Sequence, residues 1–262
     1  ALAAGVDILW VGARSTVNPF TVQEIAVALK GTNKPVLVKN PVNPDLALWI
    51  GALERLLGQD VKNLGVIHRG FSSYQKTKYR NLPNWQIALD FKHQYPNIPM
   101  FVDPSHICGR RDLLSDVTQE AFNVGYEGAM IESHCNPDAA WSDAAQQITP
   151  EVLAEMLGNL QIRNSDISGF DEEMGKHRAL ISDIDFQLIE LLSNRMKISE
   201  KIGALKKENN IAIFQPDRWK VIAEYASARA EESGMGKDFI EKVFKAIHEE
   251  SIEVQNNIMI DK

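Results

Sequence analysis

The run NLGVIHRG, residues 63–70, decides the fold class of the first part of the chain. Its apolar residues are not interleaved with polar ones, so a strand formed here would be buried on both faces. Strands of this kind are typical of parallel sheets, whose two sides are covered by helices. The run therefore predicts a parallel α/β fold.

Four more runs of this kind surround it. They are DILWVGAR (7–14), PVLVKN (35–40), IPMFVDPSH (98–106) and EGAMIESH (127–134). Successive runs begin about 25 to 35 residues apart, which is the span of one strand–helix unit. Amphipathic segments such as TVQEIAVALKG (21–31) fill the intervals. Five such units predict an α/β fold that is either a (β/α) barrel of the TIM type or a doubly wound sheet.

The composition restricts the class of protein and of partner. The chain has 262 residues, 44% hydrophobic and 24% charged, as in an ordinary globular protein of one large domain or two. Its net charge of −7 argues against nucleic acid and against an anionic membrane surface as partners. No apolar run approaches the roughly 20 residues of a membrane span, and no basic signal-peptide segment opens the sequence. Two cysteines, Cys108 and Cys135, make no disulfide framework, so a cytoplasmic protein is expected.

The spacing of apolar residues changes in the second part of the sequence. Residues 163–170 are polar and contain Gly, Ser and Asn, so they are predicted to link a domain at 1–162 to a domain at 171–262. Apolar residues then follow a 3,4 spacing at positions 181, 184, 188, 191, 198, 202 and 205. This spacing predicts one helix of about 35 to 38 residues, followed by helices near 216–232 and 237–259. A helix that long can bury its apolar stripe only where partner helices run alongside it.

Each strand-like run of the first domain ends in a residue that can bind an anion or a metal. These residues are Arg14, Lys39, Arg69, His106 and Glu132. In barrels the carboxyl ends of the strands meet at one face, so these side chains are expected to converge. The three cations would form a pocket for a phosphate and a carboxylate, the arginines by paired hydrogen bonds. The alternative is that each cation follows its strand at the surface.

His106, Glu132 and Asp143 (in WSDAAQQ) form a second set. One imidazole and two carboxylates suit a divalent ion such as Mn, Fe, Co or Zn, with a coordination position left open for a substrate. In the alternative reading Glu132 is a helix-capping acid, Asp143 is an N-cap and His106 is a hydrogen-bonded core residue. Residue types alone do not separate these readings.

Arg195 occupies a position of the long predicted helix where the 3,4 series calls for an apolar residue. Lys206 comes about three turns later and projects from nearly the same face, whereas Arg178 points about 100° away. A cation in an apolar seam has to be paired or has to bind an anion. The alternative to an anion is an ion pair within the helix, with Glu190 or Glu200.

The motifs of residues 1–162 resemble those of a known family. GARSTVNPF, VLVKNPVNPD, IHRGFSSY, DPSHICGRRDL and IESHCNPDAAWSDAAQQ, in this order, resemble short-type 3-deoxy-D-arabino-heptulosonate-7-phosphate (DAHP) synthases. The resemblance implies a (β/α)8 TIM barrel that condenses phosphoenolpyruvate with erythrose 4-phosphate. It also implies two sets of site residues: Arg14, Lys39 and Arg69 for phosphoenolpyruvate, with Lys39 catalytic, and His106, Glu132 and Asp143 as three of four metal ligands.

Two motifs of that family do not occur in the sequence. One is an AGPCS-like motif that carries the fourth ligand, a cysteine, and the other is a KPRT-like stretch that carries further substrate cations. The sequence is therefore expected to begin just before the fourth barrel strand, with three strands ahead of it. Cys108 and Cys135 are expected to be ordinary thiols, with Cys135 as the alternative fourth ligand.

Residues 171–259 resemble the all-helical chorismate mutases, through RALISDIDFQLIELLSNRMKISEKIGALKK, QPDRW and EESIEVQNN. The resemblance implies two sets of site residues: Arg178, Arg195 and Arg218 for the carboxylates of chorismate, and Lys206 and Gln255 as catalytic donors to the ether oxygen whose bond breaks. It also implies a homodimer, or a higher homo-oligomer, in which Arg178 serves the partner subunit's site. Gln215 and Trp219 stand where many relatives carry acids.

These expectations describe a bifunctional enzyme of the shikimate pathway to the aromatic amino acids. The barrel would make DAHP, the helical domain would convert chorismate to prephenate, and chorismate or prephenate would inhibit the barrel. Three alternatives stay open: a helical domain that only regulates and dimerises, a barrel that is an inert fragment, and a related barrel enzyme that uses a five-carbon sugar phosphate.

Overall fold

The computed structural model describes residues 1–74, 77–163 and 170–260. The chain divides into two compact units, Ala1–Asp166 and Ile167–Lys262. Most of the predicted linker, residues 163–170, lies outside the described residues. Among the helices of the described part, none combines the length and the apolar character needed to cross a membrane.

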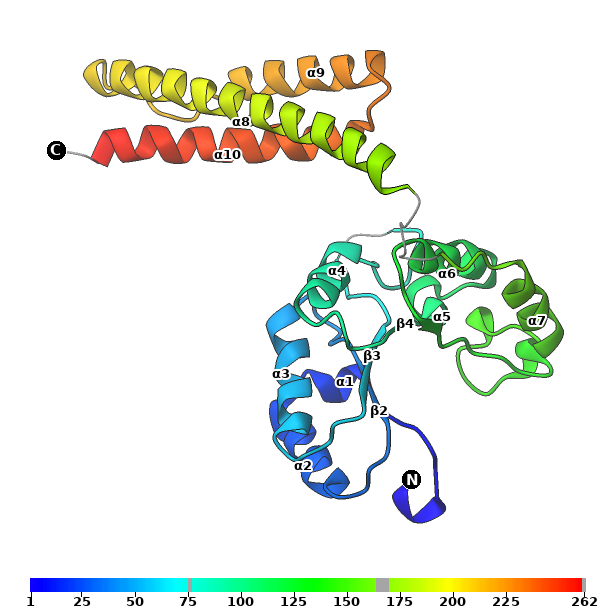
Figure 1. The fold of residues 1–262 in the computed structure, drawn as a ribbon. Helices are drawn as coiled ribbons and strands as arrows, with labels where there is room; N and C mark the ends of the chain where they lie inside the picture. The colour runs from blue at the N-terminus through cyan, green and yellow to red at the C-terminus, as the bar shows by residue number, and fades with distance from the viewer. Residues whose placement is uncertain (75–76, 164–169, 261–262) are drawn as a thin grey trace. The chain divides into compact units, whose positions relative to one another are not determined.

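The first unit is built on a parallel sheet (Figure 1). Its strands are β1 (Leu9–Val11), β2 (Val36–Lys39), β3 (Leu64–His68), β4 (Met100–Val102) and β5 (Gly128–Ala129). They pair in the order β1-β2-β3-β4-β5, so that each strand lies beside the next one in the sequence. Every residue of β3 is buried, as the unbroken run at 63–70 predicted. The prediction of five parallel strand–helix units is confirmed.

Helices connect the strands. Their bounds are η1 Leu2–Ala4, α1 Ala13–Thr16, α2 Pro19–Leu29, α3 Leu46–Leu57, α4 Trp85–Gln94, α5 Pro104–Cys108, η2 Arg111–Leu113, α6 Leu114–Asn123, η3 Pro137–Ala139, η4 Ala144–Gln146 and α7 Pro150–Asn159. Local sequence explains where several of them start. The side chains of Asn18, Asp45 and Thr149 accept backbone N–H groups at the starts of α2, α3 and α7.

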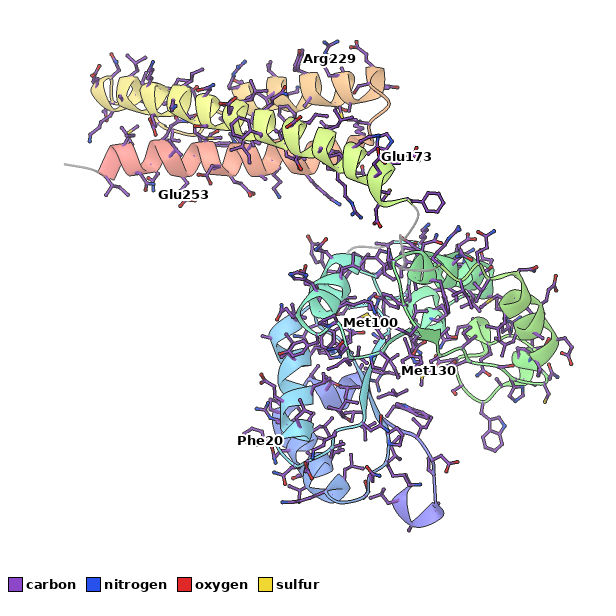
Figure 2. The ribbon with its side chains drawn as sticks, viewed as in Figure 1. Phe20, Met100, Met130, Glu173, Arg229 and Glu253 are labelled. Carbon is purple, nitrogen blue, oxygen red and sulfur yellow. The ribbon has the colours of Figure 1, made fainter. Side chains whose placement is uncertain are left out.

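The core of the first unit lies between the sheet and its helices. Trp49 of α3 packs on Phe91 of α4 with ring centroids 4.8 Å apart, and its indole N–H donates to the Val38 carbonyl of β2 at 3.2 Å. Met100 of β4 is fully buried in this core, whereas Phe20 of α2 lies at the outer surface (Figure 2). The helices are therefore fixed to the sheet by apolar contacts and by a few buried hydrogen bonds.

His68, the last residue of β3, is buried as a neutral imidazole. Burial lowers its pKa to about 4. Its Nε2 lies 2.6 Å from the Pro83 carbonyl and therefore donates, while Nδ1 accepts from the Tyr126 hydroxyl at 2.9 Å. Because both nitrogens are bound, the end of β3 is held in place just before Arg69.

The second unit is a bundle of three helices, α8 (Asp171–Glu208), α9 (Pro216–Glu232) and α10 (Lys237–Ile260), as the 3,4 spacing predicted (Figure 1). The single chain does not cover the apolar stripe of α8. All seven of its predicted positions are exposed: Ile181, Ile184, Leu188, Leu191, Ile198, Ile202 and Leu205. The neighbouring helices α9 and α10 therefore do not replace the partner helices that so long a stripe requires.

Candidate active sites

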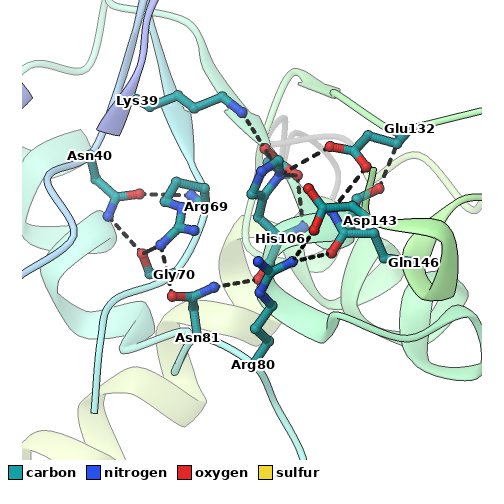
Figure 3. A network of polar contacts seen from close by, with 12 residues as sticks. Lys39, Asn40, Arg69, Gly70, Arg80, Asn81, His106, Glu132, Asp143 and Gln146 are labelled. Carbon is teal, nitrogen blue, oxygen red and sulfur yellow. Dashed lines mark hydrogen bonds and ion pairs between the residues drawn. The ribbon is translucent and has the colours of Figure 1, made fainter. Parts of the chain in front are cut away.

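Three potential metal ligands converge at the carboxyl end of the sheet. His106 lies on the short helix α5 directly after β4, Glu132 follows β5, and Asp143 precedes η4. One ligand atom from each lies within 4.8 Å of the others (Figure 3). An imidazole and two carboxylates at this spacing fit a divalent transition-metal ion.

The local geometry argues against the alternative structural roles of these acids. Asp143 has a left-handed backbone with φ 49° and makes no side-chain cap hydrogen bond to η4. Its carboxylate instead accepts a hydrogen bond from the Arg80 guanidinium at 2.8 Å, which lowers the pKa of Asp143. Glu132 is not next to a helix end, since the following segment η3 starts at Pro137 after Asn136, and its carboxylate accepts from the side-chain amide of Gln146 at 2.9 Å.

Asp103 joins the metal-ligand set to the cations. Its buried carboxylate lies 2.6 Å from Lys39 Nζ and 2.9 Å from His106 Nδ1, and it accepts the backbone N–H of His106 at 3.0 Å. Burial acts to raise the pKa of Asp103, but the hydrogen bond from His106 and the charge of Lys39 lower it overall. Asp103 is therefore ionised at neutral pH. No role was predicted for Asp103, although it directly follows β4.

Two further polar residues of the site were missed. Gln146 donates to Glu132 Oε2 at 2.9 Å and accepts from Arg80 at 2.7 Å. Because Arg80 also donates to Asp143, Gln146 and Arg80 together connect the two acids of the ligand set. Asn81 accepts from the Arg69 guanidinium at 2.8 Å and donates to the His106 carbonyl at 2.7 Å (Figure 3). Both come from irregular or one-turn segments, and no sequence pattern distinguished them from surface amides.

The predicted cations differ in exposure. Lys39 and Arg69 are each 8% exposed, whereas Arg14 on α1 is exposed. Burial lowers the pKa of Arg69; the carboxylate of Asp103 opposes this effect, and the positive charges of Arg80 and Arg14 add to it. Cations held this close to one another favour a bound anion, which would relieve their repulsion.

The two thiols of the first unit differ from each other. Cys108 is buried, and burial raises its pKa to about 12. Cys135 is exposed, three residues after Glu132. Among the described residues, the clustered ligand set comprises His106, Glu132 and Asp143 without either cysteine.

The second unit contains a cavity of about 330 Å³ between its helices. Four of the five predicted mutase residues line it: Arg195, Lys206, Arg218 and Gln255. The fifth, Arg178, is an exposed residue of α8 outside the lining. It lies 17 residues, about 25 Å along the helix, from Arg195.

Hydrogen bonds hold the polar groups of the cavity in place. Lys206 Nζ donates to Gln255 Oε1 at 3.1 Å and to the Ile213 carbonyl at 2.6 Å, and Arg195 donates to the Ser251 hydroxyl. Burial, together with the nearby charge of Arg218, lowers the pKa of Arg195. In the described residues Arg195 forms no ion pair with an acid of its own helix, so its charge is available to an anion in the cavity.

Comparison with known families decides how the chain is classified. Residues 1–167 match the model of the DAHP synthetase I family. The chain belongs to this family. Residues 177–256 match the chorismate mutase type II model, so this DAHP synthetase I family member also carries a chorismate mutase type II domain.

Curated relatives match the two parts separately. A phospho-2-dehydro-3-deoxyheptonate aldolase of Thermotoga maritima is 28% identical over 160 residues, 61% of this chain and 46% of the relative. The T-protein of Haemophilus influenzae is 28% identical over 87 residues, 33% of this chain and 23% of the relative. A 2-dehydro-3-deoxyphosphooctonate aldolase of Pseudomonas putida is 28% identical over 163 residues, 56% of this chain and 55% of the relative. The chain thus spans about half the length, or less, of these relatives.

A solved structure shares the fold. It is a truncated form of 3-deoxy-D-arabino-heptulosonate 7-phosphate synthase from Thermotoga maritima, with a TM-score of 0.54 and 25% sequence identity. The match covers 66% of this chain and 62% of that chain. The parallel strand–helix units of this family member are therefore those of a DAHP synthase barrel.

Proposed function

We propose that the chain is a bifunctional shikimate-pathway enzyme, cytoplasmic, with a DAHP synthase domain at 1–162 and a chorismate mutase domain at 171–262. The first would condense phosphoenolpyruvate with erythrose 4-phosphate, and the second would rearrange chorismate to prephenate. The observation that carries the proposal is the presence of both family matches in one chain, each over a cluster of suitable side chains.

In the first domain the cations would bind and orient phosphoenolpyruvate. Lys39, Arg69 and Arg14 would hold its phosphate and carboxylate so that C3 faces the aldehyde of the second substrate. Lys39, which we assign a catalytic role, would also offset charge that develops at C2 as the new bond forms. Asp103 would keep the Lys39 ammonium in position, 2.6 Å from its own carboxylate.

His106, Glu132 and Asp143 would hold a divalent metal, Mn, Fe, Co or Zn. The donor set fits such an ion: with Nδ1–H of His106 donating to Asp103, the lone pair of Nε2 is left for the metal. An ion bound there supplies Lewis-acid chemistry, which polarises an aldehyde oxygen. A further ligand would have to complete the coordination.

Removal of the metal should abolish one activity and spare the other. After dialysis against a chelator, we expect DAHP formation to stop and to return on addition of Mn, Fe, Co or Zn. Prephenate formation should be unchanged, because a pericyclic rearrangement in the helical domain requires orientation and hydrogen bonds but no metal. DAHP formation that persists in the chelated protein would contradict the metal assignment. If no activity appears with any of these metals, the barrel is an inert fragment.

The acceptor sugar of the first domain is part of the same test. The Pseudomonas putida relative bears the name of a different aldolase, so erythrose 4-phosphate and a five-carbon sugar phosphate should be compared directly. A chorismate mutase domain in the same chain favours erythrose 4-phosphate, because both reactions then belong to one pathway.

In the second domain Arg195 and Arg218 would bind the carboxylates of chorismate, with Arg178 supplied by the partner subunit. Lys206 and Gln255 would hydrogen-bond the ether oxygen and stabilise its developing charge. Gln215 lines the cavity and Trp219 follows Arg218, at the two positions where many relatives carry acids. If the protein binds chorismate without turning it over, the helical domain is a regulatory and dimerisation module.

The protein would be a homodimer, or a higher homo-oligomer, through α8. The support is the apolar stripe defined above: Ile181, Ile184, Leu188 and Leu191 are each more than half exposed in the single chain. A contiguous apolar face of this length is an interface in most soluble proteins. A sedimentation mass of one chain at micromolar concentration would contradict this assembly.

Binding in the helical domain would inhibit the barrel. The support is that one chain joins an early and a late reaction of one pathway through a short linker. Chorismate or prephenate, bound near Arg195 and Lys206, is expected to reduce DAHP formation by the intact protein. Proteolytic cleavage in the predicted linker, residues 163–170, should abolish this inhibition while leaving both activities. Equal inhibition of the intact and the cleaved protein would refute the coupling.

A further inference from the structure

His248 of α10 lines the cavity of the helical domain, and it is not one of the residues predicted to bind chorismate. Its ring stacks on the indole of Trp219, with centroids 4.3 Å apart and ring planes 20° apart. The ring centroid of Phe214 lies 6.1 Å from that of His248, with the two ring planes tilted by 54°. The imidazole is thus in contact with aromatic side chains at the wall of the cavity.

The Nε2 atom of His248 is buried without a hydrogen-bond partner. Among the buried side-chain nitrogen and oxygen atoms of the described residues, it is the one in this condition. A polar atom without a partner destabilises a folded protein, and an apolar ring of the same shape would not. A group bound in the cavity could supply the missing hydrogen bond. A 180° flip of the imidazole ring about its Cβ–Cγ bond exchanges the nitrogen and carbon positions, and the flipped ring still stacks on Trp219.

The charges around His248 determine what kind of group it can bind. Burial lowers its pKa, and the positive charges of Arg195 and Lys206 act in the same direction, while Glu249 opposes them. The ring is therefore neutral at neutral pH. A neutral imidazole can donate or accept one hydrogen bond, which suits an uncharged oxygen better than a carboxylate. The carboxylates are left to the guanidinium groups of Arg195 and Arg218 in the same cavity.

We propose that His248 is a ligand-binding residue of the helical domain, and that its imidazole hydrogen-bonds a hydroxyl or keto oxygen of a dicarboxylate held by Arg195 and Arg218. The inference rests on the proposed mutase function and adds a residue to that site. It also assigns Trp219 a role: the stacked indole fixes the plane of the imidazole. A site built to hydrogen-bond such an oxygen rejects ligands that lack it.

The test is calorimetric titration of the full-length protein with prephenate. His248→Phe keeps a ring that can stack on Trp219 and removes both nitrogens. We expect the Kd of this variant for prephenate to rise about tenfold, which corresponds to the loss of one hydrogen bond. Its melting temperature should stay the same or rise. His93→Phe, at an exposed histidine of α4 in the other unit, is the control and should bind as the wild type does.

The outcomes separate this inference from the proposed function. If the wild type binds prephenate and His248→Phe binds it equally well, the histidine is only a packing residue and the inference is wrong. If the wild type produces no binding heat, the proposed function fails and the inference fails with it. Should His248→Phe not fold, the comparison of His248→Gln with His248→Leu decides. Tighter binding by the glutamine variant supports the hydrogen bond, and equal binding refutes it.

Discussion

Replacement of Asp103 by asparagine should destabilise the first unit strongly. The Asp103 carboxylate is 1% exposed, and the Lys39 side chain that it pairs with is 10% exposed. In the variant the buried ammonium keeps its charge and loses its counterion. Breaking a buried ion pair in this way costs about 3–5 kcal/mol of unfolding free energy. The difference in unfolding free energy is measured by urea denaturation of the two proteins. Circular dichroism monitors the unfolding transition of the first unit.

The same substitution should weaken metal binding. Asp103 orients the His106 ring through Nδ1, and loss of such a carboxylate partner lowers metal affinity about 10–100-fold. Competition with a chromophoric chelator gives the affinity directly. The matched control is Asp60→Asn, in an exposed ion pair with Lys62, where neither stability nor metal affinity should change measurably. Wild-type metal affinity in the Asp103→Asn variant would contradict the orienting role.

The effect of Asp103 on stability should also depend on pH. Its folded pKa lies below the unfolded value of 3.8, because His106 and Lys39 outweigh the effect of burial. The unfolded state therefore binds more protons as the pH falls, and the contribution of the carboxylate decreases. The difference in stability between the wild type and Asp103→Asn should shrink as the pH falls below about 4.

Sequence patterns predicted the parallel strand–helix units of the first unit, with a barrel and a doubly wound sheet both left open, and the helices of the second. The apolar residues 64–67 within the run 63–70 suit a strand covered on both faces, and β3 is buried throughout. The 3,4 series likewise predicted α8 within a few residues. The series did not indicate what covers it, because a partner helix from the same chain and one from another chain require the same apolar residues.

The site residues likewise include some that the sequence can predict and some that it cannot. Residues directly after strands were accessible to sequence reasoning, because strand ends converge, and Asp103 could have been found by that rule. Gln146 could not, since its role depends on η4 bringing a buried amide between Glu132 and Arg80. His248 shares a helix face with Gln255, seven residues later, but only the structure shows that its ring stacks on Trp219 and that its Nε2 is buried without a partner.

Replacement of Lys206 by alanine should abolish most of the mutase activity. Its Nζ lies 3.1 Å from Gln255 Oε1, so the two side chains lie together at the wall of one cavity, and the amide nitrogen of Gln255 keeps a second N–H besides the one that it donates to the Ser251 carbonyl. Removal of one donor to a developing oxyanion lowers kcat by about 10²–10³-fold. Lys201→Ala, at an exposed position of the same helix, is the control and should retain full activity. Turnover of chorismate to prephenate, followed by its absorbance, decides between a catalytic domain and a purely regulatory one.

Subunit mixing extends this prediction to the assembly. If each site combines Lys206 of one subunit with Arg178 of the partner subunit, Arg178→Ala alone should also be inactive. A dimer of one Arg178→Ala chain and one Lys206→Ala chain then has one intact site and one site that lacks both residues. Random pairing of equal amounts makes half of the dimers mixed, so about a quarter of all sites should be active. Activity that stays at the level of the separate variants after co-expression would mean that Arg178 does not serve a partner subunit. Recovery to about a quarter would establish both the dimer and the shared site, because a monomer that contained all of its own site residues could not be rescued in this way.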